Sequence, residues 1–567
     1  MTENTTAQPG QPNILTIVLE DYFQVAAFKH LIPNDNWDRF ETRLKHNTHA
    51  ALDLLETTNN RATFFTSGWT ADHHPDVLTE IVKAGHEVAC QGYFHHSIQE
   101  VSRQLFVKDL VRSRNAVENA IGSCVLGFRI SSGWIGEKDL WALDALAEQG
   151  FAYDSSLCRI GKEFSNEPFR AVAHKHQSPT GELYEVPVSS MPFLGWSVPI
   201  SGGNYWRQFP RWPLQWGIKR WLATHNEPLV LYFHTWELDA TQPRISAANA
   251  IQRMRHYRNL ASMPEKIKHY LETYRFTSIA EHLSLDTKTE RLQADRVDAI
   301  TPESSSAVDT QKSAVPLTLI IPCFNEEASL AYLKKTLDRF SSKSHSIFDL
   351  RYIIVDDGSR DKTWQLLQQL FGDQERCMLI KHDNNKGIAA ALITAFGRVK
   401  TELLAVIDAD CTFDPDQLME MIALLTEDVD VVAASPAHKQ GAMRNVSFFR
   451  SLLSRGSAFM YRCVLHHKLT SYTSCFRLYR RRTIKDMRVS NPGFCGVAEI
   501  LGRIDLGNFR IVEYPAVLEV RLLGESKINI FRTIVDHLKL ILQLAGQRWL
   551  GRPMPEQYQV KPESKHG

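Results

Sequence analysis

Short apolar runs alternate with longer amphipathic segments along most of this chain. In the first half, runs rich in β-branched and aromatic residues predict strands, and the segments between them carry apolar residues at helical spacing. The predicted strands lie within 13–22, 61–69, 86–93, 126–132, 182–189 and 228–236, with helices within 74–85 and 139–150. The second half repeats the pattern, with strands within 317–325, 350–359, 377–383, 403–410 and 429–436. Strands separated by helices predict an α/β fold with parallel sheets, whose functional residues lie at the carboxyl ends of the strands.

A polar segment divides the chain in two. Residues 283–315 contain no aromatic residue, and their centre is rich in Ser, Thr and Asp. Such a segment buries too little apolar surface to offset the entropy of ordering it, so it predicts a flexible linker. The 567 residues exceed what one core usually holds. We therefore expect a first domain at 12–282, a second at 316–552 and a polar tail at 553–567.

The composition of the chain bears on its binding partners and on its location in the cell. The chain has 65 basic and 64 acidic residues, and this balance gives no reason to expect a nucleic-acid partner. Its first residues are polar, and its longest apolar runs are of strand length, far short of the ~20 residues of a spanning helix. The nine cysteines are scattered without CxxC pairs, which is typical of reduced thiols. These features predict a cytoplasmic protein.

Acidic residues follow three predicted strands of the second domain. They lie in the stretches PCFNEE (322–327), VDDGS (355–359) and DADC (408–411). Carboxylates that converge on one crevice are tolerated where a cation or a hydroxyl-rich ligand binds. Asp408 and Asp410 flank one small residue, and hard oxygen ligands of this kind favour Mg²⁺ or Mn²⁺.

These three stretches, in this order and spacing, resemble the family 2 glycosyltransferases of the GT-A fold. The resemblance covers almost the whole second domain and implies a nucleotide-sugar donor. It also implies that a metal and the nucleotide are held by Asp408 and Asp410. The residues that it places beside the nucleotide are Pro322, Asn325, Glu326 and Asp357, with Asp356 as a close neighbour.

Two later stretches resemble a narrower branch, the dolichyl- or polyprenyl-phosphate sugar synthases. YTSCFRLYRR (472–481) matches a TSGFR-type stretch, and RLLGESK (521–527) matches an R-x-x-G-x-S-K stretch. The resemblance implies that they surround the diphosphate and the acceptor phosphate. Cationic side chains can form charge-assisted hydrogen bonds with phosphate oxygens, and a glycine lets the backbone approach an anion closely. The residues concerned are Arg477, Arg521, Gly524, Ser526 and Lys527; Cys475 replaces the usual glycine, and Ser471 stands where an aspartate is frequent.

The acceptor determines whether a general base is needed. A hydroxyl acceptor requires one, and Glu499 in GFCGVAEILGR is the best candidate, although it equally suits a structural acid. A lipid phosphate is already anionic and requires none. Apolar residues at helical spacing in 528–549, among basic residues, predict an amphipathic helix that lies on a membrane surface or packs on its own domain. The sequence leaves both pairs of alternatives open.

The first domain resembles NodB-like polysaccharide deacetylases, which have a (β/α) barrel fold, and especially their exopolysaccharide-associated branch. The matching stretches include LEDYFQVAAF, AGHEVACQGYFHH, GFRISSGW, VPISGGNYWR and YFHTWELDATQPR. A working site of this class needs a metal held by one aspartate and two histidines, a carboxylate base and a histidine acid.

Two of these requirements are not met. Val18 replaces the aspartate that the resemblance identifies as the base, and Gln91 replaces the first histidine ligand, while His95 keeps the second place. An R-A-P-S loop has become Arg129, Ile130, Ser131 and Ser132. The acid position survives as His234; Arg129 and Asp154 also remain, and Glu20 or Asp21 retains an oxygen that could be donated.

We therefore do not expect zinc in the first domain, nor deacetylation by the usual mechanism, because valine cannot act as a base and glutamine is a weak zinc ligand. The retained residues are then either remnants of the fold or parts of a carbohydrate-binding pocket. The expected function is transfer of a sugar to a polyprenyl-phosphate or lipid-linked glycan acceptor, at the inner face of the cytoplasmic membrane if the amphipathic helix binds there. A bifunctional deacetylase and glycosyltransferase, or a non-catalytic protein that assembles with other polysaccharide-biosynthesis proteins, are the alternatives.

Overall fold

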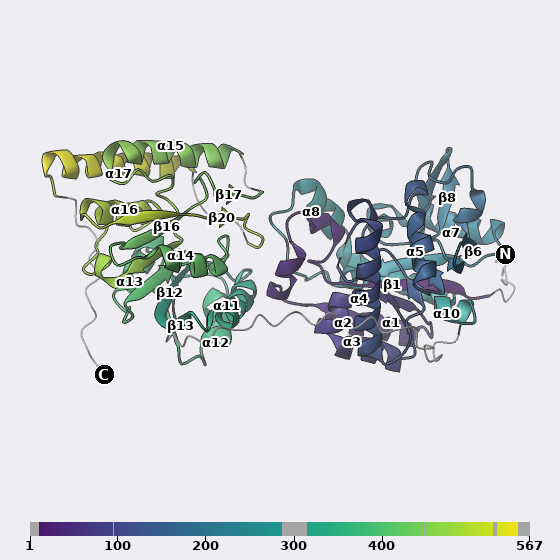
Figure 1. The fold of residues 1–567 in the computed structure, drawn as a ribbon. Coiled ribbons are helices and arrows are strands. Elements are labelled where there is room, and N and C mark those ends of the chain that lie inside the picture. Colours follow the sequence, from purple (N-terminus) through teal and green to yellow (C-terminus); the bar gives the residue numbers. More distant parts are fainter. Residues whose placement is uncertain (1–10, 95, 286–313, 446–447, 525–529, 554–567) are drawn as a thin grey trace. The chain divides into compact units, whose positions relative to one another are not determined.

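The computed structural model describes residues 11–94, 96–285, 314–445, 448–524 and 530–553 (Figure 1). These residues form two compact units, one built mainly from the chain before the predicted linker and the other mainly from the chain after it. Each unit is described by itself.

The first unit is built on a nine-stranded sheet in the order β10-β1-β2-β3-β4-β5-β7-β6, with β11 beside the start of β1. All pairs are parallel except β6 with β7. The sheet curves as an incomplete β/α barrel and brings the carboxyl ends of β1, β3 and β10 to one end. The strands of this sheet are β1 (Asn13–Leu19), β2 (Thr63–Thr66), β3 (Glu87–Cys90), β4 (Gly127–Phe128), β5 (Tyr153–Asp154), β6 (His174–Ser178), β7 (Gly181–Glu185), β10 (Val230–His234) and β11 (Phe276–Thr277). A separate hairpin pairs β8 (Ser190–Phe193) with β9 (Trp196–Pro199).

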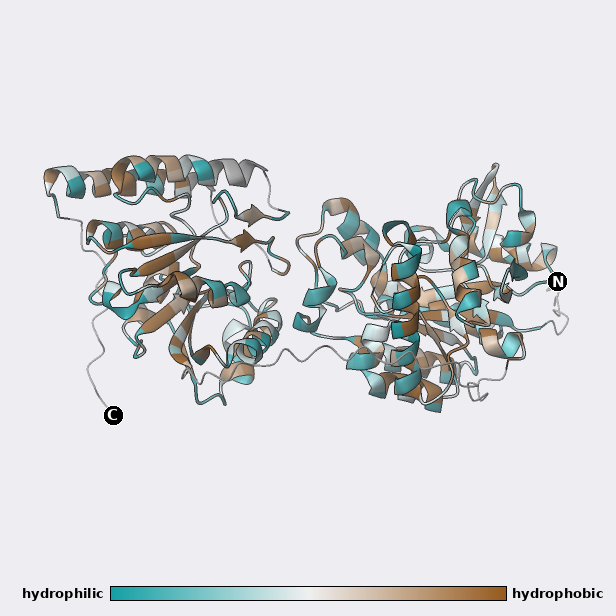
Figure 2. Cartoon of the chain, viewed as in Figure 1, coloured by the Kyte–Doolittle hydropathy of each residue, from teal (hydrophilic) through white to brown (hydrophobic). Residues whose placement is uncertain are grey.

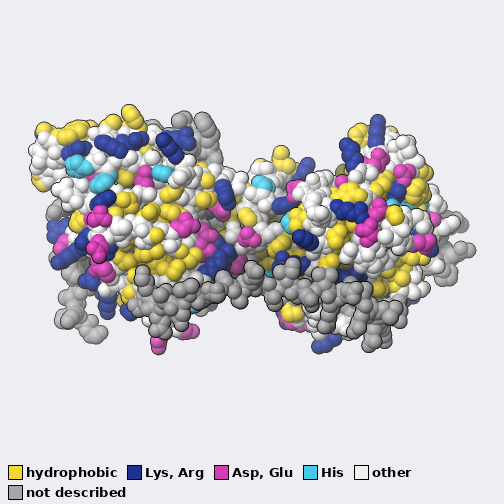
Figure 3. Space-filling view, viewed as in Figure 1, with side chains coloured by type: hydrophobic (Ala, Val, Ile, Leu, Met, Phe, Trp, Pro, Cys, Tyr) yellow, Lys and Arg dark blue, Asp and Glu magenta, His cyan; other side chains and the backbone are white. Residues whose placement is uncertain are grey.

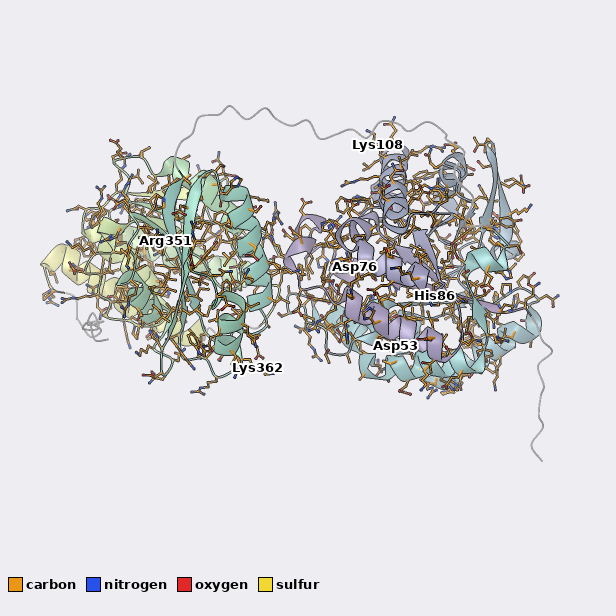
Figure 4. All side chains as sticks on the ribbon, turned by 90° about the horizontal axis from the view of Figure 1, so that it is seen from below. Asp53, Asp76, His86, Lys108, Arg351 and Lys362 are labelled. Carbon is orange, nitrogen blue, oxygen red and sulfur yellow. The ribbon has the colours of Figure 1, made fainter. Side chains whose placement is uncertain are left out.

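Helices connect these strands and cover the outside of the sheet. In α3, the proline at the first position and the spacing of Val77, Leu78 and Ile81 give a helix with one buried face. On the opposite side, Asp76 of α3, labelled in Figure 4, pairs with Lys45 of α1 at 3.0 Å. The helices of this unit are α1 (Leu44–Thr57), α2 (Gly68–His73), α3 (Pro75–Lys83), α4 (Arg103–Ile121), α5 (Trp141–Glu148), α6 (Asn204–Gln208), α7 (Arg211–Thr224), α8 (Ala250–Tyr257), α9 (Met263–Thr273) and α10 (Ile279–His282).

The second unit is built on a seven-stranded sheet in the order β14-β13-β12-β15-β18-β16-β19. All pairs are parallel except those of β18, which runs antiparallel between β15 and β16. Figure 2 shows hydrophobic residues along these strands, as expected of a sheet covered on both faces. Its strands are β12 (Val315–Cys323), β13 (Phe348–Asp356), β14 (Cys377–Lys381), β15 (Leu403–Val406), β16 (Val431–Ser435), β18 (Arg477–Arg480) and β19 (Ile511–Pro515); β17 (Ala442–Met443) pairs with β20 (Val517–Leu518) beside it.

The helices of the second unit surround this sheet. In α13, almost every residue is buried against the strands. Two long helices, α15 and α17, contact each other, and α17 also contacts α16 (Figure 1). The helices are α11 (Leu330–Ser344), α12 (Thr363–Phe371), α13 (Ile388–Phe396), α14 (Leu418–Leu424), α15 (Phe448–Val464), α16 (Cys495–Leu506) and α17 (Ile530–Leu550). Within the described residues, no helix is long and apolar enough to cross a membrane.

The strands and helices predicted from the apolar pattern are all present, and the fold is α/β as predicted. The pattern missed short strands such as β5, and it missed β6, the β8–β9 hairpin and β18. In β18, Arg477 and Arg480 flank Leu478 and Tyr479, so this strand lacks the longer apolar run that identified the other strands. The strand is nevertheless central, because the cationic Arg477 donates its hydrogen bonds inside the protein.

Candidate functional sites

A cavity of about 300 Å³ lies at the carboxyl ends of β1, β3 and β10 in the first unit. Apolar and aromatic side chains form much of its wall, including Trp134, Tyr232 and Trp236. Polar side chains reach into it from the strand ends, among them Glu20, Gln91 and His234. A small-molecule site typically combines such apolar walls with a few convergent polar groups, and the volume lies at the lower end of the range for these sites.

An ion pair lies in this cavity. His234 Nδ1 is 2.6 Å from Glu20 Oε1, and Trp236 Nε1 donates a hydrogen bond of 2.9 Å to the same carboxylate oxygen. Burial disfavours the charged imidazolium, but the negative charge of Glu20 more than offsets this, so the pKa of His234 is raised above its ordinary value. The carboxylate of Glu20 thus favours the protonated form of His234 inside the cavity.

The two substituted positions of the deacetylase motif lie beside this pair. Val18 is paired with His234 in the register of β1 and β10, so an apolar side chain stands where the resemblance requires a base. Gln91 lines the same cavity and is buried, and among the described residues its Oε1 has no hydrogen-bond partner. His95, the predicted second ligand, lies outside the described residues. Within the described ranges, His, Cys, Asp and Glu side chains form no group of three that could hold a metal.

Asp21 lies outside this cavity. Its carboxylate accepts hydrogen bonds from Thr42 Oγ1 (2.7 Å) and from the backbone N–H of Arg43 (2.8 Å) and Tyr22 (3.0 Å). Burial raises the pKa of Asp21 to about 6 despite these donors. Of the two acidic residues that the sequence left open as donors, the structure directs Glu20 into the cavity and uses Asp21 to hold the chain at Thr42.

Arg129 and Asp154 are both buried, and Arg129 lines the cavity. Arg129 donates to Thr16 Oγ1 (2.8 Å) and to Ser155, and burial lowers the pKa of its guanidinium to about 10. Asp154 accepts hydrogen bonds from Ser156 and is paired in register with Glu185. Burial and the charge of Asp154 raise the pKa of Glu185 well above its ordinary value. Glu185 could not be identified from the sequence, because a single glutamate in a strand carries no spacing signal.

In the second unit, the three acidic strand ends come together as predicted. β13, β12 and β15 are neighbours in the sheet, with Cys323 paired to Asp356 and Ile320 to Val406. Pro322 lies near the end of β12, and the chain turns at Asn325, which has a φ of 51°. The Asn325 side chain accepts a hydrogen bond of 2.7 Å from the backbone N–H of Arg360, which joins the loops that follow β12 and β13.

Asp356 and Asp357 differ in how their oxygens are used. Asp357 accepts hydrogen bonds from the backbone N–H of Lys386 (2.9 Å) and Gly387 (2.7 Å), and its Oδ1 lies 2.7 Å from His382 Nδ1. Asp356 Oδ1 accepts from the backbone of Ser359, whereas its buried Oδ2 has no hydrogen-bond partner among the described residues. Within the described part of the chain, the carboxylate oxygen without a partner at this strand end therefore belongs to Asp356. From the sequence, Asp356 was expected only as a close neighbour of the residues beside the nucleotide.

Arg521 links two of the acidic stretches. Its guanidinium forms an ion pair with Glu326, after β12, and its Nη1 lies 3.5 Å from Asp410 Oδ2, after β15. Gly524 makes this position possible, because a Cβ atom there would lie 2.7 Å from Arg521 Nη2. Asp410 also accepts a hydrogen bond from the backbone N–H of Thr412, and Asp408 precedes it on the same loop. The carboxylates of Asp408 and Asp410 are hard oxygen donors, and this donor set fits a hard divalent cation.

Arg477 and Glu499 are occupied by contacts within the protein. Arg477 donates to the carbonyl oxygens of Tyr472 (2.7 Å) and Val497 (2.9 Å). Glu499 accepts from the backbone N–H of Ser490 (2.7 Å) and forms a 2.8 Å ion pair with Arg503. Both side chains are buried, so their catalytic roles stay predictions while the structure gives each a structural role. Ser526 and Lys527 lie outside the described residues.

The amphipathic segment near the end of the chain forms α17. Its buried side contains His537, Leu540 and Leu544, and Tyr461 of α15 contacts His537 at 2.7 Å. Only part of the predicted apolar stripe packs on its own domain: Ile541 packs against the core of the unit, whereas Ile534, Leu538 and Leu542 are exposed, Leu542 by 74%. The helix thus has one apolar face against its own unit and a second one open to solvent.

Three family models match the chain, in an order that follows the two units. A polysaccharide deacetylase model matches residues 35–151, and a domain family of unknown function, DUF3473, matches 155–284. The model of glycosyl transferase family 2 matches residues 318–488. The chain therefore contains a polysaccharide deacetylase domain followed by a family 2 glycosyltransferase domain.

Curated relatives match the second unit. A dolichol-phosphate mannosyltransferase of Pyrococcus furiosus is 28% identical over 240 residues, which cover 41% of this chain and 64% of the relative. A polyprenol monophosphomannose synthase of Mycolicibacterium smegmatis is 26% identical over 227 residues, covering 39% and 82% respectively. The chain thus spans just under two thirds of the first relative's length.

Among solved structures, the chain is similar to glucosyl-3-phosphoglycerate synthase from Mycobacterium tuberculosis in complex with Mn²⁺, UDP and phosphoglyceric acid. The two are 16% identical with a TM-score of 0.31, and the match covers 41% of this chain and 78% of the other.

Proposed function

We propose that this chain, a family 2 glycosyltransferase that also carries a polysaccharide deacetylase domain, transfers a sugar from a nucleotide-sugar donor to a polyprenyl-phosphate or lipid-linked glycan acceptor. The product would enter cell-surface or exopolysaccharide synthesis. The observation that carries the proposal is the position of Arg521, whose guanidinium contacts both Glu326 and Asp410. A site that gathers carboxylates and a movable cation at strand ends suits a diphosphate and its counter-ion.

Asp408 and Asp410 would hold a divalent cation, Mg²⁺ or Mn²⁺, which neutralises charge on the leaving diphosphate when it is bound. Arg521 would then donate to phosphate oxygens, since a guanidinium between two carboxylates can exchange these partners for an anion of similar geometry. Lys527 would add a second positive charge. Asp356 would accept a hydrogen bond from the nucleotide with its free oxygen, while Asp357 would hold the loop at Lys386 and Gly387 in place.

The surroundings of Glu499 favour a lipid phosphate over a hydroxyl as acceptor. A general base must be able to receive a proton from the acceptor. Both oxygens of Glu499 already accept hydrogen bonds from Ser490 or Asn491, and Arg503 pairs with the carboxylate. A phosphate acceptor is anionic at neutral pH and requires no base, so the site could act without Glu499.

The surface formed by α15 and α17 would bring the second unit to a membrane. Figure 3 shows hydrophobic side chains among Lys and Arg along this edge of the unit. Phe459 and Leu542 are exposed there, and Arg455, Arg462 and Lys539 are exposed on the same two helices. Apolar side chains with basic neighbours suit the interface of an anionic bilayer. We place the protein at the inner face of the cytoplasmic membrane.

The first unit would bind glycan without deacetylating it. Its cavity offers aromatic walls, the Glu20–His234 pair and the unused acceptor of Gln91, which are groups that can bind sugar hydroxyls. Val18 and Gln91 leave the site without its base and without one metal ligand. We propose the domain boundaries 12–282 and 316–552, with the linker 283–315 between them and the tail 553–567 after them.

The test is a screen of the purified full chain against UDP- and GDP-sugars with Mn²⁺ or Mg²⁺ and a polyprenyl phosphate. We expect metal-dependent transfer from one donor, and a loss of at least about a hundredfold in Asp410→Ala. Glu427→Ala, which removes an exposed carboxylate of the same unit, is the matched control. Turnover that survives in Asp410→Ala would rule out metal-assisted transfer, and a complete lack of donor binding would favour a non-catalytic assembly protein.

A further inference from the structure

The β8–β9 hairpin of the first unit ends in an apolar tip. Phe193 is paired with Trp196, and the two residues between them, Leu194 and Gly195, turn the chain with φ angles of 49° and 81°. Leu194 is 86% exposed, and Phe193 and Trp196 are also exposed. Tight turns with positive φ favour Asn and Gly, so a leucine costs conformational energy at this position. An exposed leucine that is also strained indicates a contact outside the fold.

The hairpin is anchored to the rest of the unit next to its tip. Gly161 and Ser197 exchange two backbone hydrogen bonds, of 2.9 and 2.8 Å. The helix α7 packs against the hairpin, because a Cβ atom at Gly217 would lie 2.9 Å from Ile200 and 3.8 Å from Met191. The exposed tip therefore belongs to a hairpin that is packed on the rest of the unit, and insertion into an apolar phase would not require the hairpin to become ordered first.

The helix α7, which packs against this hairpin, carries further exposed apolar side chains. Trp212 and Trp216 are one turn apart and exposed, Trp212 by 74%, whereas Leu214, Ile218 and Trp221 form the buried side. The Arg220 guanidinium lies over the ring of Trp216, 5.4 Å from its centroid. We call Phe193, Leu194, Trp196, Trp212 and Trp216 the hairpin–helix surface.

The charged residues in the segment that carries this surface are all basic. Residues 186–226 include no Asp or Glu, but they include Arg207, Arg211, Lys219 and Arg220. Arg207 is buried and paired with Glu237, while the other three are exposed. Basic residues beside tryptophans and an apolar tip match the anionic headgroups and the acyl boundary of a bilayer. A sugar platform would instead require polar side chains at the edges of the rings.

We propose that the hairpin–helix surface inserts into the interface of an anionic lipid bilayer, with the apolar tip among the acyl chains and Arg211, Lys219 and Arg220 at the headgroups. The first unit would thus be a membrane-binding module in its own right. This proposal goes beyond the proposed transfer reaction, and it does not depend on which sugar is transferred or on whether the cavity binds glycan.

The experiment measures co-flotation of the full chain with vesicles of phosphatidylcholine, with and without phosphatidylglycerol. All variants carry Leu538→Gln and Leu542→Gln, which remove the exposed face of α17. On this background, Phe193→Thr with Leu194→Asn replaces the tip and creates an Asn-Gly turn, which suits the observed φ angles, so the hairpin still forms. Ile251→Gln with Met254→Gln removes two exposed apolar side chains of α8 and is the matched control.

We expect the tip variant to lower partitioning into anionic vesicles at least about tenfold, because two apolar side chains no longer enter the bilayer. The α8 control should bind as the background protein does. Lys219→Gln with Arg220→Gln should lower binding about fivefold for each charge on anionic vesicles, with no change on neutral ones. Equal flotation of the tip variant and the background protein would overturn the proposal.

Sedimentation velocity without vesicles tests whether a second copy of the chain, and not a lipid bilayer, covers the hairpin–helix surface. If the background protein self-associates, and the tip variant loses self-association but not vesicle binding, the surface belongs to a second copy of the chain and the lipid proposal is wrong. Sugar transfer to a water-soluble, short-chain acceptor phosphate is measured on the same samples. If a variant loses vesicle binding but keeps sugar transfer, the membrane surface and the transfer site are separate. If the background protein binds vesicles but transfers no sugar, the proposed function fails while the membrane proposal stands.

Discussion

His234 and Glu20 form an ion pair of 2.6 Å in the cavity that also contains Val18 and Gln91, the two substituted positions of the deacetylase motif. Trp236 donates to the same oxygen of Glu20, so the carboxylate is held from two sides. The charge on the imidazole therefore depends on Glu20. This dependence can be measured.

Glu20→Gln should lower the pKa of His234. The glutamate charge is what raises this pKa, and without it the burial of the ring dominates and favours the neutral form. Titration of the His234 ring by NMR in the full chain would measure the change. Asp53→Asn, which removes an exposed carboxylate of α1 (Figure 4), is the control and should leave the titration unchanged. An unchanged pKa in Glu20→Gln would show that the two side chains are not coupled.

The same pair predicts the sign of a pH effect on stability. A histidine whose pKa is raised on folding contributes stability that is fully present below its unfolded pKa and is lost as pH rises through the folded value. The unfolding midpoint of the parent protein should therefore exceed that of Glu20→Gln most clearly near about pH 6, and the gap should shrink above it. Thermal unfolding at a series of pH values measures it. A difference in unfolding midpoint that widens as pH rises would contradict the raised pKa of His234.

Arg521→Ala should reduce nucleotide-sugar turnover by about a hundredfold, because it removes the cation that contacts Glu326 and Asp410. Arg521→Lys should recover only part of the loss, since an ammonium cannot donate a parallel pair of hydrogen bonds. Steady-state kinetics would report both, with Arg351→Ala, an exposed arginine of β13 labelled in Figure 4, as the control. Full activity in Arg521→Ala would remove this side chain from the site.

Glu499→Gln and Arg503→Gln separate a structural acid from a general base. Each change leaves one member of the ion pair without its partner, so each should lower the free energy of unfolding of the second unit, by about 2–4 kcal/mol. If Glu499 is structural, the two variants should lose activity in parallel with stability. A loss of kcat in Glu499→Gln alone, at unchanged stability, would identify it as the base.

Gln91→His should raise the zinc affinity of the full chain at least about tenfold, because it supplies an imidazole at the end of β3, where glutamine is a weak ligand. The unaltered chain should neither retain stoichiometric zinc nor release acetate from N-acetylated oligosaccharides. Metal analysis and an acetate assay measure these outcomes. Metal-dependent acetate release by the unaltered chain would establish a bifunctional enzyme.

Much of the fold could be predicted from the sequence, because runs such as LTLIIPCFN and LLAVIDAD carry the apolar continuity of buried parallel strands. The convergence of Glu326, Asp356 and Asp410 followed from the rule for parallel sheets, since these residues lie at or shortly after the carboxyl ends of neighbouring strands. Local pattern failed at β18, where burial of Arg477 depends on carbonyl oxygens of Tyr472 and Val497.

The hydrogen bonds and ion pairs of the individual side chains could not be predicted, because they depend on partners that are distant in sequence. Asp356 and Asp357 are adjacent, yet His382 and the loop at Gly387 occupy only the second of them. Glu20 forms its ion pair with His234, which is more than two hundred residues away in the sequence. Similarly, nothing in the spacing of Glu499 distinguishes a base from an acid that holds Ser490 in place.

The antiparallel strand β18 also has a consequence for synthesis of the protein on the ribosome. β15 and β16 are both made before β18, and each pairs with it on one side. Until Arg477–Arg480 emerges, the growing chain therefore carries two open strand edges of apolar sequence, which are sites of aggregation. Nascent chains that stop before residue 477 should require a chaperone, whereas those that stop after 480 can close the centre of the sheet.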